Sequence, residues 1–160
     1  MLETFHDLTG DLDYSMLVVT TSDGSRRAGC LVGFATQCSI DPARYLVCLS
    51  KANHTYATAD GAEVLVVHAL GTDQVELARL FGEATGDEVD KFAACRWHPG
   101  RGGAPVLDDC PNRFAGRILE RIDVGDHVAF VLEPVEAESA PGSTSLLFSA
   151  VKDLEPGHRA

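Results

Sequence analysis

Hydrophobic residues occur in short runs separated by turn-forming residues, a pattern typical of β-strands. Residues 14–21 are rich in β-branched side chains and end at Ser22-Asp23-Gly24-Ser25, which predicts a hairpin turn. Residues 28–36 then read as the return strand. The two glycines of this second segment, Gly29 and Gly33, indicate a bulge or a close approach of another group to the backbone.

Later segments continue the same pattern. Residues 44–50 are apolar at nearly every position, which predicts a strand buried on both faces. Further strands are predicted over residues 63–69, 113–123, 127–137 and 145–151, and helices over 53–60, 73–83 and 87–94. Asn53 is expected to cap the first of these helices and Gly61 to end it. Residues 97–105 are rich in glycine and proline and predict a loop.

The order of these segments indicates the fold class. About seven strands follow one another as hairpins, with helices only before and after the fourth, so the chain lacks a regular βαβ alternation. The pattern favours an antiparallel barrel or sandwich with short helices covering its ends. The chain has no repeat and no linker, which predicts a single domain over residues 1–160.

Composition and charge narrow the function classes. The chain has 160 residues, 45% of them hydrophobic, with 13 Lys and Arg against 24 Asp and Glu and a net charge of −11. An acidic protein is a poor match for nucleic acid or an anionic membrane, although local donors can still hold a small anion. Residues 1–13 lack the apolar run of a signal peptide. Five cysteines, an odd number, indicate reduced thiols in a cytoplasmic protein.

Several kinds of chemistry find little support in the motifs. The sequence has no dinucleotide fingerprint, no phosphate loop and no nucleophile elbow. Cys95-x-x-His98 lacks a second ligand pair, so no metal site is predicted. His68 lies within a predicted strand and is interpreted as a core or sheet-face histidine with one hydrogen bond. Trp97 and His98 either cover a pocket as a lid or anchor their loop to the barrel.

The segment between Gly33 and Thr55 carries the most specific chemistry. A strand rich in small and polar residues is followed by a strand that runs into the expected helix start at Asn53. A helix start offers unpaired N–H groups, and Lys51 adds a positive charge. These groups predict a phosphate-binding corner. The alternative interpretation is that Asn53 and Thr55 only cap the helix and Lys51 is solvated.

A series of motifs in this order resembles the flavin reductase-like family, the FMN-binding split barrels. The motifs are Ser39-x-Asp41-Pro42, Leu46 to Leu49, Ser50-x-x-x-x-Thr55, Asp90-Lys91-Phe92, Trp97-x-x-Gly100, Gly103 to Leu107 and Gly125-Asp126-His127. The resemblance runs from about Tyr14 to about Ala137. It implies a mainly β, antiparallel split β-barrel of Greek-key type with a few short helices and a core of about residues 12–152.

The resemblance also implies a function and a site. Family members reduce FMN or FAD with NADH or NADPH, usually as homodimers with flavin near the interface, and many supply reduced flavin to a partner monooxygenase. Transferred by position, the expected flavin-binding residues are Gly33, Phe34, Ala35, Thr36, Gln37, Cys38, Ser39, Ser50, Lys51, Asn53, His54, Thr55, Lys91 and Phe92. His127 is the expected catalytic residue, near flavin and nicotinamide; the alternative is a hairpin residue paired to Asp126.

One segment departs from the family pattern. Members often show Asn-Ser-Phe-Thr-Ser where this chain has Gly33-Phe34-Ala35-Thr36-Gln37, so most of the expected polar side chains are replaced. Backbone N–H and C=O groups can also read a flavin ring. The substitution leaves three alternatives open: a deazaflavin or haem in place of FMN or FAD, a non-catalytic binder in place of a reductase, and a homologue of the same fold that has lost its ligand site.

Overall fold

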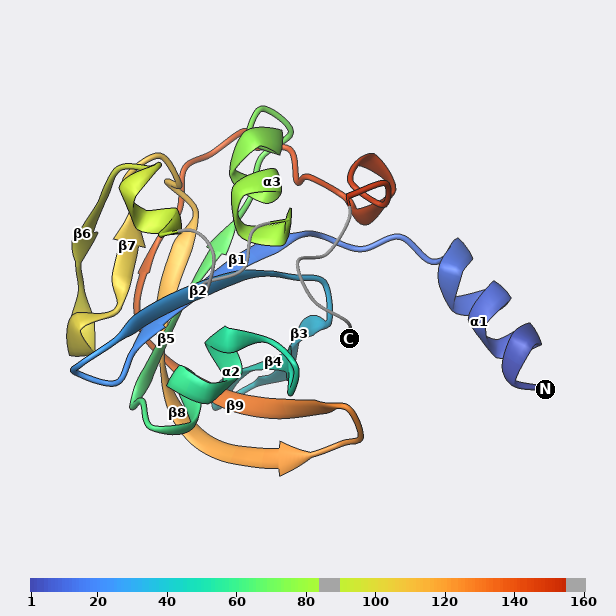
Figure 1. Cartoon of the computed structure of the whole chain (residues 1–160), viewed down its shortest axis with the longest axis horizontal. Coiled ribbons are helices and arrows are strands. Elements are labelled where there is room, and N and C mark those ends of the chain that lie inside the picture. Colours follow the sequence, from blue (N-terminus) through green and yellow to red (C-terminus); the bar gives the residue numbers. More distant parts are fainter. Residues whose placement is uncertain (84–89, 155–160) are drawn as a thin grey trace.

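The computed structural model describes residues 1–83 and 90–154 (Figure 1). Over these residues the chain forms three α-helices, nine strands and three 3₁₀ turns. In chain order they are α1 (Leu2–Asp11), β1 (Leu17–Ser22), β2 (Arg27–Val32), β3 (Ala35–Ile40), β4 (Ala43–Ser50), α2 (His54–Asp60), β5 (Val64–Ala69), α3 (Val75–Glu83), η1 (Lys91–Ala93), β6 (Trp97–Pro99), η2 (Arg101–Gly103), β7 (Pro105–Leu107), β8 (Arg113–Asp123), β9 (His127–Glu138) and η3 (Phe148–Ala150).

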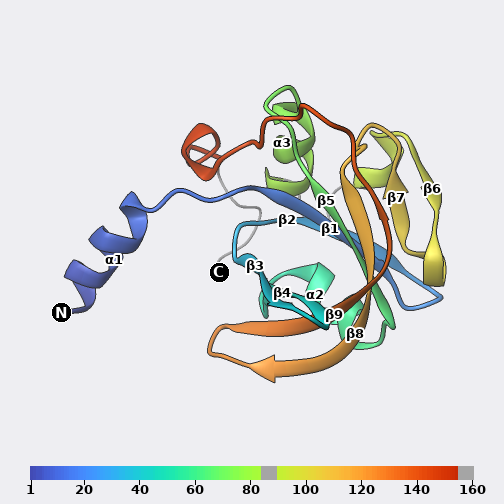
Figure 2. The same cartoon turned by 180° about the vertical axis from the view of Figure 1, so that it is seen from behind.

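An antiparallel sheet of seven strands, in the order β2-β1-β5-β8-β9-β4-β3, dominates the described residues. Figures 1 and 2 show this sheet curled around an interior, and α2 packs against β2, β1 and β4. The interior holds apolar side chains from five strands and α2, among them Val19, Val47, Leu65 and Phe130. A mainly β, antiparallel architecture with short helices is therefore confirmed.

A second apolar layer covers the other side of β1 and β2. Helix α3 packs there through Ala78 and Phe81, together with Phe92, Leu107 and Leu146 from later segments. Burying apolar side chains on both faces of the same strands contributes the dominant stabilisation of such a fold. Strand β2 is thus held from both sides, and its end is fixed in space.

Most of the predicted elements are confirmed. The strands over 44–50, 63–69, 113–123 and 127–137 correspond to β4, β5, β8 and β9, and the helix over 73–83 to α3. Asn53 caps α2, and its side chain accepts a hydrogen bond from the Thr55 amide, while Gly61 ends the helix. Both glycines of the second segment meet close neighbours, as predicted: a Cβ on Gly29 would lie 2.9 Å from the Phe81 ring.

The single strand predicted over residues 28–36 is wrong. The chain forms β2 up to Val32 and β3 from Ala35, and these two strands lie at opposite edges of the sheet. The break falls at Gly33 and Phe34, where the Tyr14 ring packs against the Gly33 backbone and the Cys48 amide donates to the Phe34 carbonyl. These contacts redirect the chain from one edge to the other.

Two other predictions are also wrong. Residues 97–105 include strand β6, which pairs with β7 through Trp97 and Leu107, because Gly102 and Gly103 take positive φ values in the connecting turn. Residues 145–151 form single bridges and the turn η3 instead of a strand, because Asp13 binds both the amide and the hydroxyl of Ser149. The helix predicted over 87–94 lies partly outside the described residues, and η1 occupies its described part.

Helix α1 was not predicted. It projects from the body of the molecule (Figures 1 and 2), and none of its residues is buried. Met1, Phe5, Leu8 and Leu12 follow helical spacing, and this signal could have located the helix. No described helix is long and apolar enough to cross a membrane.

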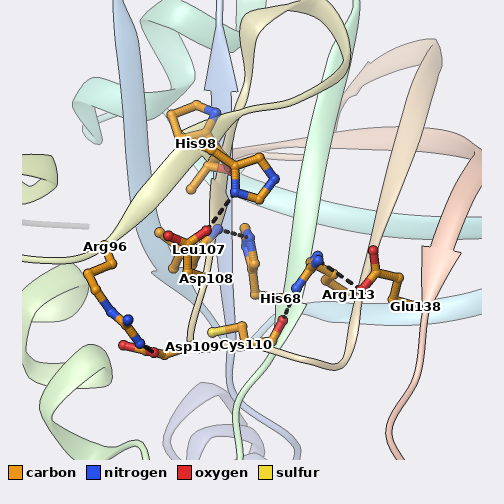
Figure 3. A network of polar contacts seen from close by, with 11 residues as sticks. His68, Arg96, His98, Leu107, Asp108, Asp109, Cys110, Arg113 and Glu138 are labelled. Atoms are coloured by element: carbon orange, nitrogen blue, oxygen red, sulfur yellow. Dashed lines mark hydrogen bonds and ion pairs between the residues drawn. The ribbon is translucent and has the colours of Figure 1, made fainter.

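His68 is a core residue with two hydrogen-bonding contacts instead of the one predicted, and Figure 3 shows the contact with Leu107. Its side chain is fully buried on β5, with Nδ1 3.0 Å from the Val18 carbonyl and Nε2 accepting from the Leu107 amide at 3.0 Å. The ring therefore joins β5, β1 and β7. Burial is the main reason that the pKa of His68 is lowered to about 4, so the ring is neutral near pH 7.

Candidate functional site

A pocket of about 330 Å³ lies where the ends of β2, β4 and α3 meet the C-terminal segment. Five of the predicted site residues line it: Gly33, Phe34, Ser50, Asn53 and His127. They come from three separate parts of the sequence, and the pairing of Ser50 with His127 across β4 and β9 brings two of those parts together. The sheet register therefore assembles this pocket.

One wall of the pocket is aromatic. The Phe34 ring is 56% exposed, and its centroid lies 5.2 Å from that of His127 with the rings tilted by 50°. Tyr14 and Phe148 continue this wall on the other side of Phe34. An exposed aromatic surface next to a cavity offers a planar ligand a face for stacking.

Polar side chains also line the pocket. Ser50 and Asn53 lie at the junction of β4 and α2, where their side-chain oxygens accept hydrogen bonds from the Ala52 and Thr55 amides. The capping interpretation is therefore correct for Asn53. The Thr55 side chain is 1% exposed and lies beside Cys30.

Lys51 and His127 are both paired to carboxylates of the β8–β9 turn. Lys51 Nζ lies 2.7 Å from Asp123, and this hydrogen bond is the main reason that the pKa of Asp123 is lowered. His127 Nδ1 lies 2.6 Å from Asp126 and lowers the pKa of that carboxyl chiefly by the same kind of bond. An ionised Asp126 fixes a proton on Nδ1, so Nε2 is the nitrogen of the neutral ring that can accept a proton.

Two cysteine thiols, Cys30 and Cys48, also line the pocket. Burial raises the pKa of both above the ordinary value for cysteine. The thiolate is the nucleophilic form, so these residues are suited to packing and not to covalent catalysis.

Lys91 and Phe92 lie behind the pocket wall. The Lys91 ammonium donates to the carbonyls of Gly29 and Phe81 at 3.1 Å each, and burial lowers its pKa. Phe92 packs edge-on against Phe81, and the Trp97 indole N–H donates to the Phe92 carbonyl. The structure thus favours Trp97 as an anchor over Trp97 as a lid.

The remaining predicted residues lie outside the lining of this pocket. Ala35, Thr36, Gln37, Cys38 and Ser39 form the edge strand β3, and His54 begins α2. Sequence reasoning missed Tyr14 and the C-terminal residues Phe148, Val151, Lys152 and Leu154, all of which line the pocket. No local motif marks these residues, because they join the site only through the tertiary packing.

The pocket fits a flavin in its chemistry. Its volume is at the lower end of the range for ligand sites, which is about 300–1,000 Å³. Its aromatic wall suits a planar ring, and the Ser50–Asn53 end together with Lys152 suits a hydroxylated, anionic chain. Metal chemistry has no comparable support, since the described residues contain no group of three or more potential metal ligands.

The fold and this pocket define an antiparallel β-protein with an aromatic-lined pocket, and comparison with known proteins identifies the family. Residues 9–153 match the flavin reductase like domain, so the chain belongs to that family. The FMN reductase (NADH) RutF of Bradyrhizobium diazoefficiens is 33% identical over 126 residues, which cover 78% of this chain and 69% of the relative.

Solved structures agree with this assignment. The NADH:FAD oxidoreductase SgcE6 of Streptomyces globisporus C-1027 superimposes with a TM-score of 0.83 at 25% identity, covering 99% of this chain and 92% of that one. The same enzyme in complex with NAD and FAD fragments gives a TM-score of 0.80 at 25% identity, covering 91% and 87%.

Proposed function

We propose that this protein is an NADH-dependent flavin reductase that takes FMN, with FAD as the alternative flavin and NADPH as the alternative reductant. The observation that carries the proposal is a pocket lined both by an aromatic wall and by the polar start of α2, in a chain of the flavin reductase family. The relatives named as FMN reductase (NADH) and NADH:FAD oxidoreductase support a flavin, FMN or FAD, and NADH as the two co-substrates.

The chain's own residues supply position and electrostatics. A bound flavin provides the redox chemistry, accepting a hydride from the reduced nicotinamide. The aromatic wall orients the ring, and Ser50, Asn53 and Lys152 attract the phosphate. Lys51, which follows Ser50 and is paired to Asp123, adds a positive charge outside the pocket lining. His127, held by Asp126, is the proposed catalytic residue and exchanges a proton at Nε2.

The family also supports a proposal about the finer fold. We propose that the curled sheet is a split β-barrel of Greek-key type, in one domain over residues 1–160. Edge strands β2 and β3 are joined by only two residues, Gly33 and Phe34, yet each pairs on one side alone within the described residues. This arrangement supports a barrel that is split between β2 and β3.

A homodimer with flavin near the interface is the proposed assembly. Cross-strand neighbours on the outer face of β4 and β9 are apolar, namely Leu46 with Val131 and Cys48 with Ala129. Leu46, Cys48 and Val131 are only partly buried in the single chain, although the sequence predicts burial on both faces of β4. A second copy on this face would complete that burial, and the face borders the pocket at Phe34 and Cys48.

We also propose a partner protein and a cellular compartment. We propose that the reduced flavin is passed to a partner monooxygenase. The net charge of −11 supports the absence of a role in binding nucleic acid or an anionic membrane. All five cysteines are free thiols, which supports the reducing environment of the cytoplasm.

The test is an anaerobic absorbance titration of the purified protein with FMN, followed by NADH. We expect FMN to bind and its visible bands to bleach on addition of NADH at a rate well above that of FMN and NADH alone. Binding of flavin without bleaching by NADH or NADPH would identify a carrier. A protein that binds neither FMN nor FAD would overturn the proposal, and a Soret band would indicate haem.

A further inference from the structure

Phe34 is an exposed aromatic residue at the point where the chain departs from the family pattern. Its side chain is 56% exposed, although it lies between two edge strands of the core sheet and lines the pocket. The exposed ring therefore offers an apolar face to a ligand in the pocket, and covering this face would bury apolar surface.

Phe34 belongs to a continuous row of rings along the pocket. Phe148 and Tyr14 are stacked with centroids 4.9 Å apart and planes 13° apart. Tyr14 lies 6.3 Å from Phe34, and Phe34 lies 5.2 Å from His127. The row therefore joins the C-terminal segment to the proposed catalytic histidine.

The surrounding contacts fix this row in place. A Cβ on Gly33 would lie 2.4 Å from the Tyr14 ring, so the Tyr14 ring can pack here only against glycine. Asp13 holds the C-terminal segment through the Ser149 amide at 3.0 Å and through the Ser149 hydroxyl. The Phe34 carbonyl accepts from the Cys48 amide at 2.9 Å. Rings held by such contacts lose little further entropy on binding a ligand.

We propose that Phe34 is a specificity-determining residue, whose ring recognises the planar flavin by stacking in place of the polar side chains that this strand end lacks. Gly33 and Phe34 then act as a pair: the glycine admits Tyr14, and Tyr14 supports the Phe34 ring. The inference rests on the proposed function, since it assigns a role within the same pocket.

The test compares the dissociation constant of FMN for the full-length wild type, Phe34→Ala, Phe34→Tyr and a control, Phe5→Ala, by equilibrium dialysis. Phe5 is the matched control because its ring is 53% exposed and lies on α1, outside the pocket. We expect Phe34→Ala to weaken FMN binding by about tenfold, as truncation of a stacking ring does. Phe34→Tyr keeps the ring and should stay within about threefold of wild type, and Phe5→Ala should match wild type.

A second readout reports on proximity and does not depend on turnover. A tryptophan in contact with a flavin quenches its fluorescence, so FMN bound to Phe34→Trp should emit less than FMN bound to Phe5→Trp. Equal FMN affinity of Phe34→Ala and Phe5→Ala, or equal emission of the two tryptophan variants, would overturn the role of Phe34. A wild type that binds neither FMN nor FAD would instead overturn the proposed function.

Discussion

At the scale of single residues, His68 shows how burial determines protonation. Its pKa is lowered to about 4 in the folded protein, against about 6.5 for an exposed histidine. Between these two values the unfolded chain binds more protons than the folded one. The contribution of His68 to stability is therefore complete above about pH 6.5 and is lost as the pH falls through about 4.

Replacing His68 by leucine should lower the free energy of unfolding by about 3 kcal/mol at pH 7, because the buried Val18 carbonyl and Leu107 amide lose their partner. Urea unfolding of the wild type and of His68→Leu at pH 7 and pH 5 measures these free energies of unfolding. The variant should also lose less stability than wild type between the two pH values, because it has no buried imidazole to protonate.

His98→Leu is the matched control for this prediction. His98 is an exposed residue of β6 paired to Asp108, so its replacement should change stability by about 0.5 kcal/mol or less. Equal losses in His68→Leu and His98→Leu would contradict the structural role of His68.

At the scale of elements, the start of α2 combines a structural and a binding role in one side chain. Asn53 caps the helix and also lines the pocket. Asn53→Ala should lower the free energy of unfolding by about 1 kcal/mol, the usual cost of losing an N-cap, as measured by thermal or urea unfolding.

Asn53→Asp separates the two roles. Aspartate is an equally good cap, so stability should remain near that of wild type. The added negative charge should repel the phosphate and weaken FMN binding more than riboflavin binding. A variant that binds FMN as tightly as wild type would remove this helix start from the phosphate site while leaving its capping role intact.

At the scale of the whole molecule, the outer face of β4 and β9 is expected to be the dimer interface. Val131→Glu places a charge on this face, on the side of the sheet opposite Phe130 of the core. We expect the dimer dissociation constant to rise by at least about tenfold in sedimentation equilibrium, because an unpaired charge would be buried in the interface.

The control is Leu147→Glu, which adds the same charge at a residue that is 40% exposed beside η3. It should leave the association state of the wild type unchanged. A wild type that is monomeric at all concentrations, or a Val131→Glu variant that still dimerises as wild type does, would exclude this interface.

Local patterns in the sequence were enough to predict several strands and the ends of one helix. Alternating and continuous apolar runs located β4, β5, β8 and β9, because side chains of a strand alternate between faces. Asn53 and Gly61 located the ends of α2, since capping is decided within a few residues. The ordered motifs also located the family and the two segments that carry Ser50 and His127.

Other features depend on contacts between residues that are distant in the sequence, and only the tertiary structure shows them. Residues 28–36 are apolar enough for one strand, yet the packing of Tyr14 on Gly33 divides them between two edges of the sheet. Lys91 lies in the Asp90-Lys91-Phe92 motif, but its place behind the pocket wall depends on the carbonyls of Gly29 and Phe81. The aromatic wall from Phe148 to His127 forms only when the two ends of the chain meet, because stacking requires proximity in space and leaves no local pattern.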